Sequence, residues 1–170
     1  MANPITGHRR AGAISLARSL IAWWALLGGV VLAAVVAVNV LSVAGGVFGT
    51  PFPGDFEMTE VGVAVAAFAF LPYCQLYGAN VTADIFTAGL SERAIEALSA
   101  LASLVALGFA VLLFCRMYLG MIDQKVYGYT TAILQFPHWA AFIPILASLA
   151  LLALAAAITL VESLHLMRRS

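Results

Sequence analysis

Four long apolar runs account for most of this 170-residue chain, and they contain very few ionisable side chains. A helix needs about 20 apolar residues to cross the hydrocarbon core of a bilayer. The runs cover residues 16–47, 61–77, 97–118 and 139–161. Hydrophobic residues make up 64% of the chain and charged residues 9%, against about half and a quarter in soluble domains. The sequence therefore predicts an all-α membrane protein with four transmembrane helices in a single membrane domain, residues 1–170.

The basic residues predict how these helices are oriented. One side of the predicted membrane domain collects six of the eight basic residues and the other side only two. The six are Arg9, Arg10, Arg18, Arg93, Arg168 and Arg169, and the two are Arg116 and Lys125. Cytoplasmic loops are enriched in Lys and Arg, so both termini are expected in the cytoplasm. The loops 48–60 and 119–138 then face outward, and Trp139 belongs to an aromatic belt at the outer surface. The net charge of zero argues against a nucleic-acid partner.

The few polar residues in the runs have structural interpretations. Asn39 is expected to form a hydrogen bond between helices, and Glu162 is expected to be solvated at a helix end. Arg116 is placed near the outer end of the third helix, where a snorkelling side chain is the first interpretation. The alternative is an ion pair with Glu57 or Glu60 at the start of the second helix.

Small residues recur every four positions in the first and third helices. One such row is Gly29, Ala33 and Ala37, and another is Ala102, Ala106 and Ala110. Rows of this kind let helices approach closely in lipid. We expect most of them to pack within the chain, and a row left uncovered is available to another protein.

Three functional classes fit the residues poorly. A haem-carrying anchor subunit needs axial ligands within the helices, but His8, His138 and His165 fall in tails or at helix ends. A proton-coupled exporter needs a carboxylate at mid-membrane depth, and every acidic residue lies in a loop or at a helix end. No convergent nucleophile and base can be proposed for an enzyme. The residues favour a structural or interaction role without a cofactor.

A family resemblance is carried by several segments in order. The clearest is residues 71–84, LPYCQLYGANVTAD, in which Asp84 matches an acidic position of the family and Asn80 stands where histidine is common. Glu60 at the start of the second helix fits the pattern, as do residues 134–139, LQFPHW, and the Ile-Pro pair at 143–144. Together these segments resemble the small Q-type membrane subunit of TRAP transporters, the DctQ-like family.

The resemblance implies a small scaffold subunit in a bacterial inner membrane. Its partners would be a large M-type permease subunit, which carries the substrate and sodium sites, and a periplasmic protein that captures an organic acid. Sodium coupling would then lie in the partner, and Asp84 would stabilise the turn after the second helix. The alternative is an anchor or assembly subunit of another membrane complex, for example a redox complex.

Overall fold

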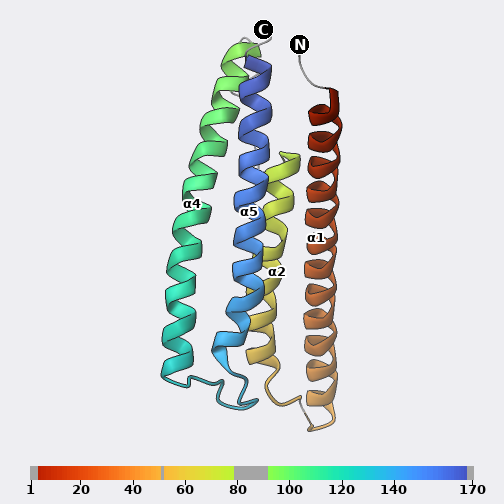
Figure 1. Cartoon of the computed structure of the whole chain (residues 1–170). Helices are drawn as coiled ribbons and strands as arrows, with labels where there is room; N and C mark the ends of the chain where they lie inside the picture. Colours follow the sequence, from red (N-terminus) through yellow and green to blue (C-terminus); the bar gives the residue numbers. More distant parts are fainter. Residues whose placement is uncertain (1–3, 51, 79–91, 168–170) are drawn as a thin grey trace.

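The computed structural model describes residues 4–50, 52–78 and 92–167 and consists of four long helices (Figure 1). They are α1 (Pro4–Val47), α2 (Asp55–Tyr77), α4 (Glu92–Val126) and α5 (His138–Met167). All four are long and apolar enough to cross a membrane, as the apolar runs predict. The start of α1 and the end of α5 lie at one end of the molecule, here called the terminal end. The loops that join α1 to α2 and α4 to α5 lie at the other, here called the loop end.

The helices are longer than the apolar runs that predict them. The largest difference is in α4, which continues to Val126, so eight residues of the expected loop 119–138 are helical. Residues 119–122 are mostly apolar and extend the run without a helix-breaking residue, and Gly128, with φ of 64°, follows soon after the helix ends. Consequently Arg116 lies well inside α4.

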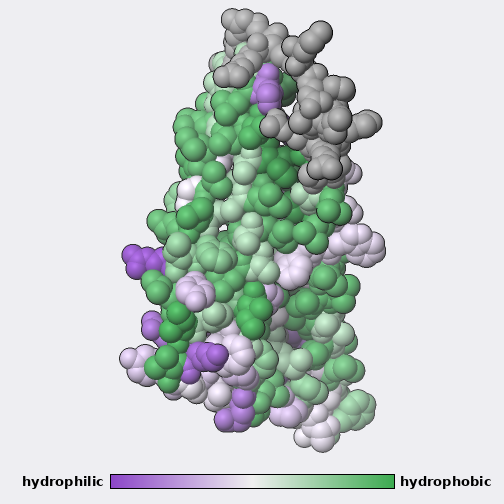
Figure 2. All heavy atoms as spheres, viewed as in Figure 1, coloured by the Kyte–Doolittle hydropathy of each residue, from purple (hydrophilic) through white to green (hydrophobic). Residues whose placement is uncertain are grey.

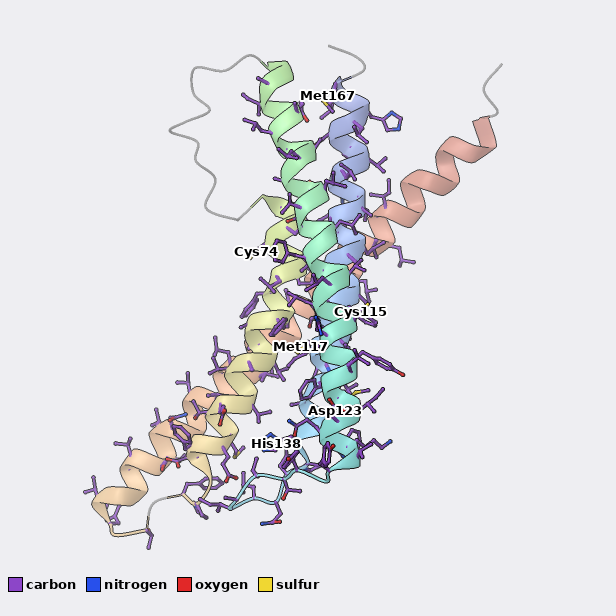
Figure 3. All side chains as sticks on the ribbon, turned by 90° about the vertical axis from the view of Figure 1, so that its left-hand side faces the viewer. Cys74, Cys115, Met117, Asp123, His138 and Met167 are labelled. Carbon is purple, nitrogen blue, oxygen red and sulfur yellow. The ribbon has the colours of Figure 1, made fainter. Side chains whose placement is uncertain are left out.

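The helices are arranged in the order α4, α5, α2, α1 rather than as a closed bundle. α5 packs against α4 on one side and α2 on the other, while α1 packs mainly against α2 (Figure 1). α1 and α4 are therefore the two edges of the arrangement. In the view that faces α4, α1 crosses behind the other helices at an angle (Figure 3).

Two glycines set the close approach of α1 to α2. A Cβ placed on Gly28 would lie 2.7 Å from the Cβ of Ala69, and one on Gly62 would lie 2.3 Å from Val35 Cγ2. Each helix thus receives a side chain of the other where it has none itself. The predicted row that begins at Gly29 does not make this contact, because Gly29 faces open space and the two alanines that follow it are exposed.

The best-buried apolar contact joins three helices. Ile21 of α1, Leu76 of α2 and Ala155 of α5 form one cluster, and Leu151 and Ile158 pack against it. Elsewhere the surface is apolar, and many large hydrophobic side chains on α1 and α4 are exposed. Figure 2 shows apolar side chains over most of the visible face, with hydrophilic ones gathered toward the loop end. Such a surface suits lipid or another membrane-embedded protein.

Candidate functional site

Hydroxyl groups join α4, α5 and α2 in the half of the molecule near the terminal end. Ser103 of α4 donates to Thr159 Oγ1 of α5 over 3.0 Å, and Gln75 Nε2 of α2 donates to the same oxygen over 3.3 Å. One turn away, Ser99 and Ser163 share a hydrogen bond of 3.0 Å. Because these groups satisfy one another between helices, they stabilise the packing of α4, α5 and α2.

Two side chains of α1 reach across to α5. Arg18 forms an ion pair with Glu162, with distances of 2.7 and 3.0 Å from its Nη2 to the two carboxylate oxygens. Trp24 Nε1 donates to Ser148 Oγ over 2.9 Å. Glu162 was expected to be solvated at a helix end; its side chain is 41% exposed, and the partner that the expectation lacked is the guanidinium group that α1 brings to it. These contacts hold α1 to α5 where the two helices otherwise touch little.

At the loop end, polar side chains join α1 to α2. Asn39 Nδ2 donates to Thr59 Oγ1 over 2.7 Å, which confirms the predicted hydrogen bond between helices. Ser42 donates to the carboxylate of Asp55 in the first turn of α2. The carboxylate also accepts the amide of Phe56 over 2.8 Å. These bonds fix the end of α1 against the beginning of α2.

Glu57 holds the loop between α4 and α5. Its two carboxylate oxygens accept the backbone amides of Ile133 and Leu134 over 2.8 and 3.0 Å. Gly54, with φ of 82°, leaves the space that Leu134 fills, because a Cβ there would lie 2.6 Å from Leu134 Cγ. We call these contacts, together with the two bonds from α1, the loop-end clamp. It connects α1, α2 and the 127–137 loop to one another at the loop end.

The residues singled out from the sequence have different surroundings. Trp139 is half-buried at the start of α5, and the Nζ of Lys125 lies 5.3 Å from its ring centroid. Glu60 and Arg116 are both exposed, on α2 and α4 respectively. No ion pair joins Arg116 to Glu57 or Glu60, since Arg18 forms the single ion pair found in the described part of the chain.

Two further predicted residues, Asn80 and Asp84, lie outside the described residues. Within residues 4–50, 52–78 and 92–167, no group of three or more His, Cys, Asp or Glu side chains is placed to hold a metal ion.

What sequence reasoning missed were the partners of polar residues far apart in the chain. Arg18 and Glu162 are 144 positions apart, and Glu57 lies 76 positions from the loop it holds. The sequence shows acidic residues in the first turn of α2, but it does not show that Glu57 binds amides of the 127–137 loop. Taken together, the polar contacts tie helices and loops to one another.

The comparisons with known proteins gave one family. The family model described as "Tripartite ATP-independent periplasmic transporters, DctQ component" matches residues 34–166. The match covers the last third of α1, from residue 34 on, and the whole of α2 and α4, and it ends one residue before the end of α5. No curated protein and no solved structure gave a significant match.

Proposed function

Because the chain belongs to the DctQ family of tripartite ATP-independent periplasmic (TRAP) transporter components, we propose that it is the small scaffold subunit of a tripartite importer. In this role it supports a large M-type permease subunit during sodium-coupled uptake of an organic acid delivered by a periplasmic binding protein. The observation that carries the proposal is the family match over residues 34–166. The substrate and sodium sites belong to the permease subunit in this proposal, and no step of transport is assigned to residues of this chain.

The packing of the polar groups supports a static role. A permease that moves a transport domain needs a fixed body in the bilayer against which the movement takes place. Here the polar side chains of the helix interiors form bonds between helices, as at Thr159 and Asn39. Breaking such bonds in lipid is unfavourable because no water replaces them. The chain is thus built to keep one helix arrangement.

We further propose that the terminal end is cytoplasmic and the loop end faces the periplasm of a bacterial inner membrane. The excess of basic residues toward the two termini supports this orientation. The loop-end clamp would then lie at the periplasmic surface. It holds the 127–137 loop in one conformation there, beside exposed Tyr127 and Tyr129, so that a binding protein meets a rigid surface.

Reconstitution tests the proposal directly. The permease, the binding protein and this chain are purified together, placed in proteoliposomes, and assayed for uptake of a panel of radiolabelled organic acids. We expect uptake only when all three proteins and an inward sodium gradient are present. This chain alone is expected to insert and transport nothing. Full uptake by the permease and binding protein without it would refute the scaffold role, and haem or flavin in the purified complex would favour a redox complex instead.

A further inference from the structure

Among the described residues, Arg116 is a charged side chain without a partner on a mostly apolar surface of α4, whose next charged residue on the same stripe is exposed Asp123, two turns nearer the loop end. Arg116 is exposed, and among the described residues it has neither an ion pair nor a hydrogen bond. Phe109, Leu112 and Leu119 lie along the same stripe of the helix and are 61%, 55% and 55% exposed. We call these four residues the Arg116 face. In Figure 3, which looks onto α4, the neighbouring Cys115 and Met117 are labelled about midway along the helices.

The register between α4 and α5 gives the depth of Arg116. The Ser103–Thr159 hydrogen bond and the position of Gly120 beside the Phe142 ring define one antiparallel register. Arg116 precedes Gly120 by four residues, so it lies level with Leu146, four residues after Phe142. Leu146 is seven residues along α5 from Trp139, which corresponds to about 10 Å.

The distance from Arg116 to Lys125 along α4 gives a second measure of the depth of Arg116. Arg116 lies nine residues before Lys125, whose ammonium group stacks on Trp139, and nine residues correspond to about 14 Å. Aromatic and basic residues of this kind sit at the membrane interface. In α4 and α5, Arg116 is therefore the one charged residue that lies between the Lys125–Trp139 level and the level of Glu162, roughly a third of the way from the loop end.

Snorkelling brings the guanidinium group of Arg116 only part of the way to the membrane surface. The Cα–Cβ bonds of a helix tilt toward its N-terminus, and α4 begins at the terminal end (Figure 1). The side chain of Arg116 therefore starts in the direction away from the nearer membrane surface. An arginine side chain reaches roughly 6–7 Å by its bond lengths, which is less than the distance to the level of Trp139. An arginine left in lipid at such a depth is unfavourable.

On α1, the other edge of the helix arrangement, no charged side chain lies at a comparable depth. Between residues 19 and 54 the chain contains no Asp, Glu, Lys or Arg. The polar side chains Asn39 and Ser42 on α1 are bonded to α2. Exposed Glu60 on α2 lies one turn from Glu57, which binds the loop amides of Ile133 and Leu134, so it is near the loop end of its helix. The free surface of α1 is therefore compatible with lipid, and that of α4 is not.

From this difference we infer that the Arg116 face of α4 is the surface that binds the large permease subunit. The inference rests on the proposed function and adds which edge of the chain is covered. The matching surface is an apolar transmembrane helix with an Asp or Glu side chain at the level of Leu146. That carboxylate accepts hydrogen bonds from the Arg116 guanidinium, whose planar geometry favours two parallel bonds. The free surface of α1 faces lipid.

Photocrosslinking distinguishes the two edges. Benzoylphenylalanine replaces Leu112 beside Arg116, or Val36 on α1 as the matched control, because these side chains are 55% and 56% exposed. Each variant is co-expressed with the permease and irradiated in membranes. We expect a crosslinked product of the two subunits from position 112 and none from position 36. A product from position 36 alone, or only lipid adducts at position 112, would overturn the inference.

A charge test complements the crosslinking. Arg116→Leu should lower the yield of co-purified permease by about tenfold or more, because it leaves a carboxylate of the partner buried and unpaired. Arg116→Lys should keep most of the yield, and the Tm of the isolated Arg116→Leu subunit should not fall, which separates lost binding from misfolding. Wild-type yield from Arg116→Leu would refute the inference alone. A wild-type chain that captures no permease would refute the proposed function as well.

Discussion

The close approach of α1 and α2 at Gly28 gives the sharpest test of the fold. Replacing Gly28 with Ala places a Cβ 2.7 Å from the Cβ of Ala69, whereas ordinary van der Waals contact begins at 3.4 Å. Neither atom can rotate away, because a Cβ is fixed by its backbone. The two helices must therefore separate by about 0.7 Å at this point, and a gap of that size forfeits a quarter to a half of each dispersion contact beside it.

The expected magnitude follows from how helices associate in lipid. Their packing depends on van der Waals contact and hydrogen bonds, since lipid supplies little hydrophobic driving force. Overpacking of a tight interior typically costs about 1–3 kcal/mol. For a chain of this size that corresponds to a fall in Tm of roughly 2–12 °C. Thermal unfolding of the purified subunit in detergent, followed by size-exclusion chromatography after heating, measures it.

Two control variants isolate the contact. Gly29→Ala makes the same chemical change one position along, where nothing lies within 4 Å. It should leave Tm unchanged or raise it, because alanine favours a helix by up to about 1 kcal/mol over glycine. The exchange variant Gly28→Ala with Ala69→Gly keeps the total volume and the helix propensity, and it should recover most of the loss. Equal Tm for Gly28→Ala and Gly29→Ala would show that the helices do not meet as described.

Three further changes probe the polar contacts. Glu57→Gln removes one of two acceptors for the loop amides, so hydrogen exchange at those amides should accelerate several-fold in mass spectrometry; unchanged exchange would contradict the clamp. A double-mutant cycle of Asn39→Leu with Thr59→Val should give a coupling of about 0.6 kcal/mol in thermal unfolding, and zero coupling would remove their hydrogen bond. Arg18 and Glu162 are 43% and 41% exposed, so Glu162→Gln should cost no more than about 1 kcal/mol. Exchanging the two charges should restore the stability, and a larger loss on exchange would argue against the pair.

The parts of the fold that follow from local composition were predictable. Four apolar runs give four helices because the hydrocarbon core requires about 20 residues for each crossing. The role of Asn39 was also predictable, since an amide at its depth has few favourable alternatives to a bond with a neighbouring helix. Both inferences depend only on the chemistry of a short segment in its solvent.

Features that depend on which helix faces which were not predictable. Whether Gly28 or Gly29 meets α2 is decided by a rotation of α1 of about 100°, and the row of small residues in the sequence indicates Gly29, which is not the one that meets α2. The pairing of Arg18 with Glu162 requires that α1 and α5 lie side by side at the terminal end, which a single sequence does not specify. The depth of Arg116 depended on where α4 ends, and the aromatic Tyr118 resembles an interface anchor eight residues before that end.

The open order of the helices explains why the surroundings of one charged residue, Arg116, indicate where a partner binds. In a closed bundle, a polar side chain in any helix can turn toward a common interior and find a partner there. Here α4 packs mainly on α5, so most of its circumference has no neighbour among the described helices. Ser99 and Ser103 point at α5 and are bonded, whereas Arg116 points elsewhere and is not. Since an unpaired guanidinium at this depth is unfavourable in lipid, the residue is best accounted for by a protein surface that only the assembled complex supplies.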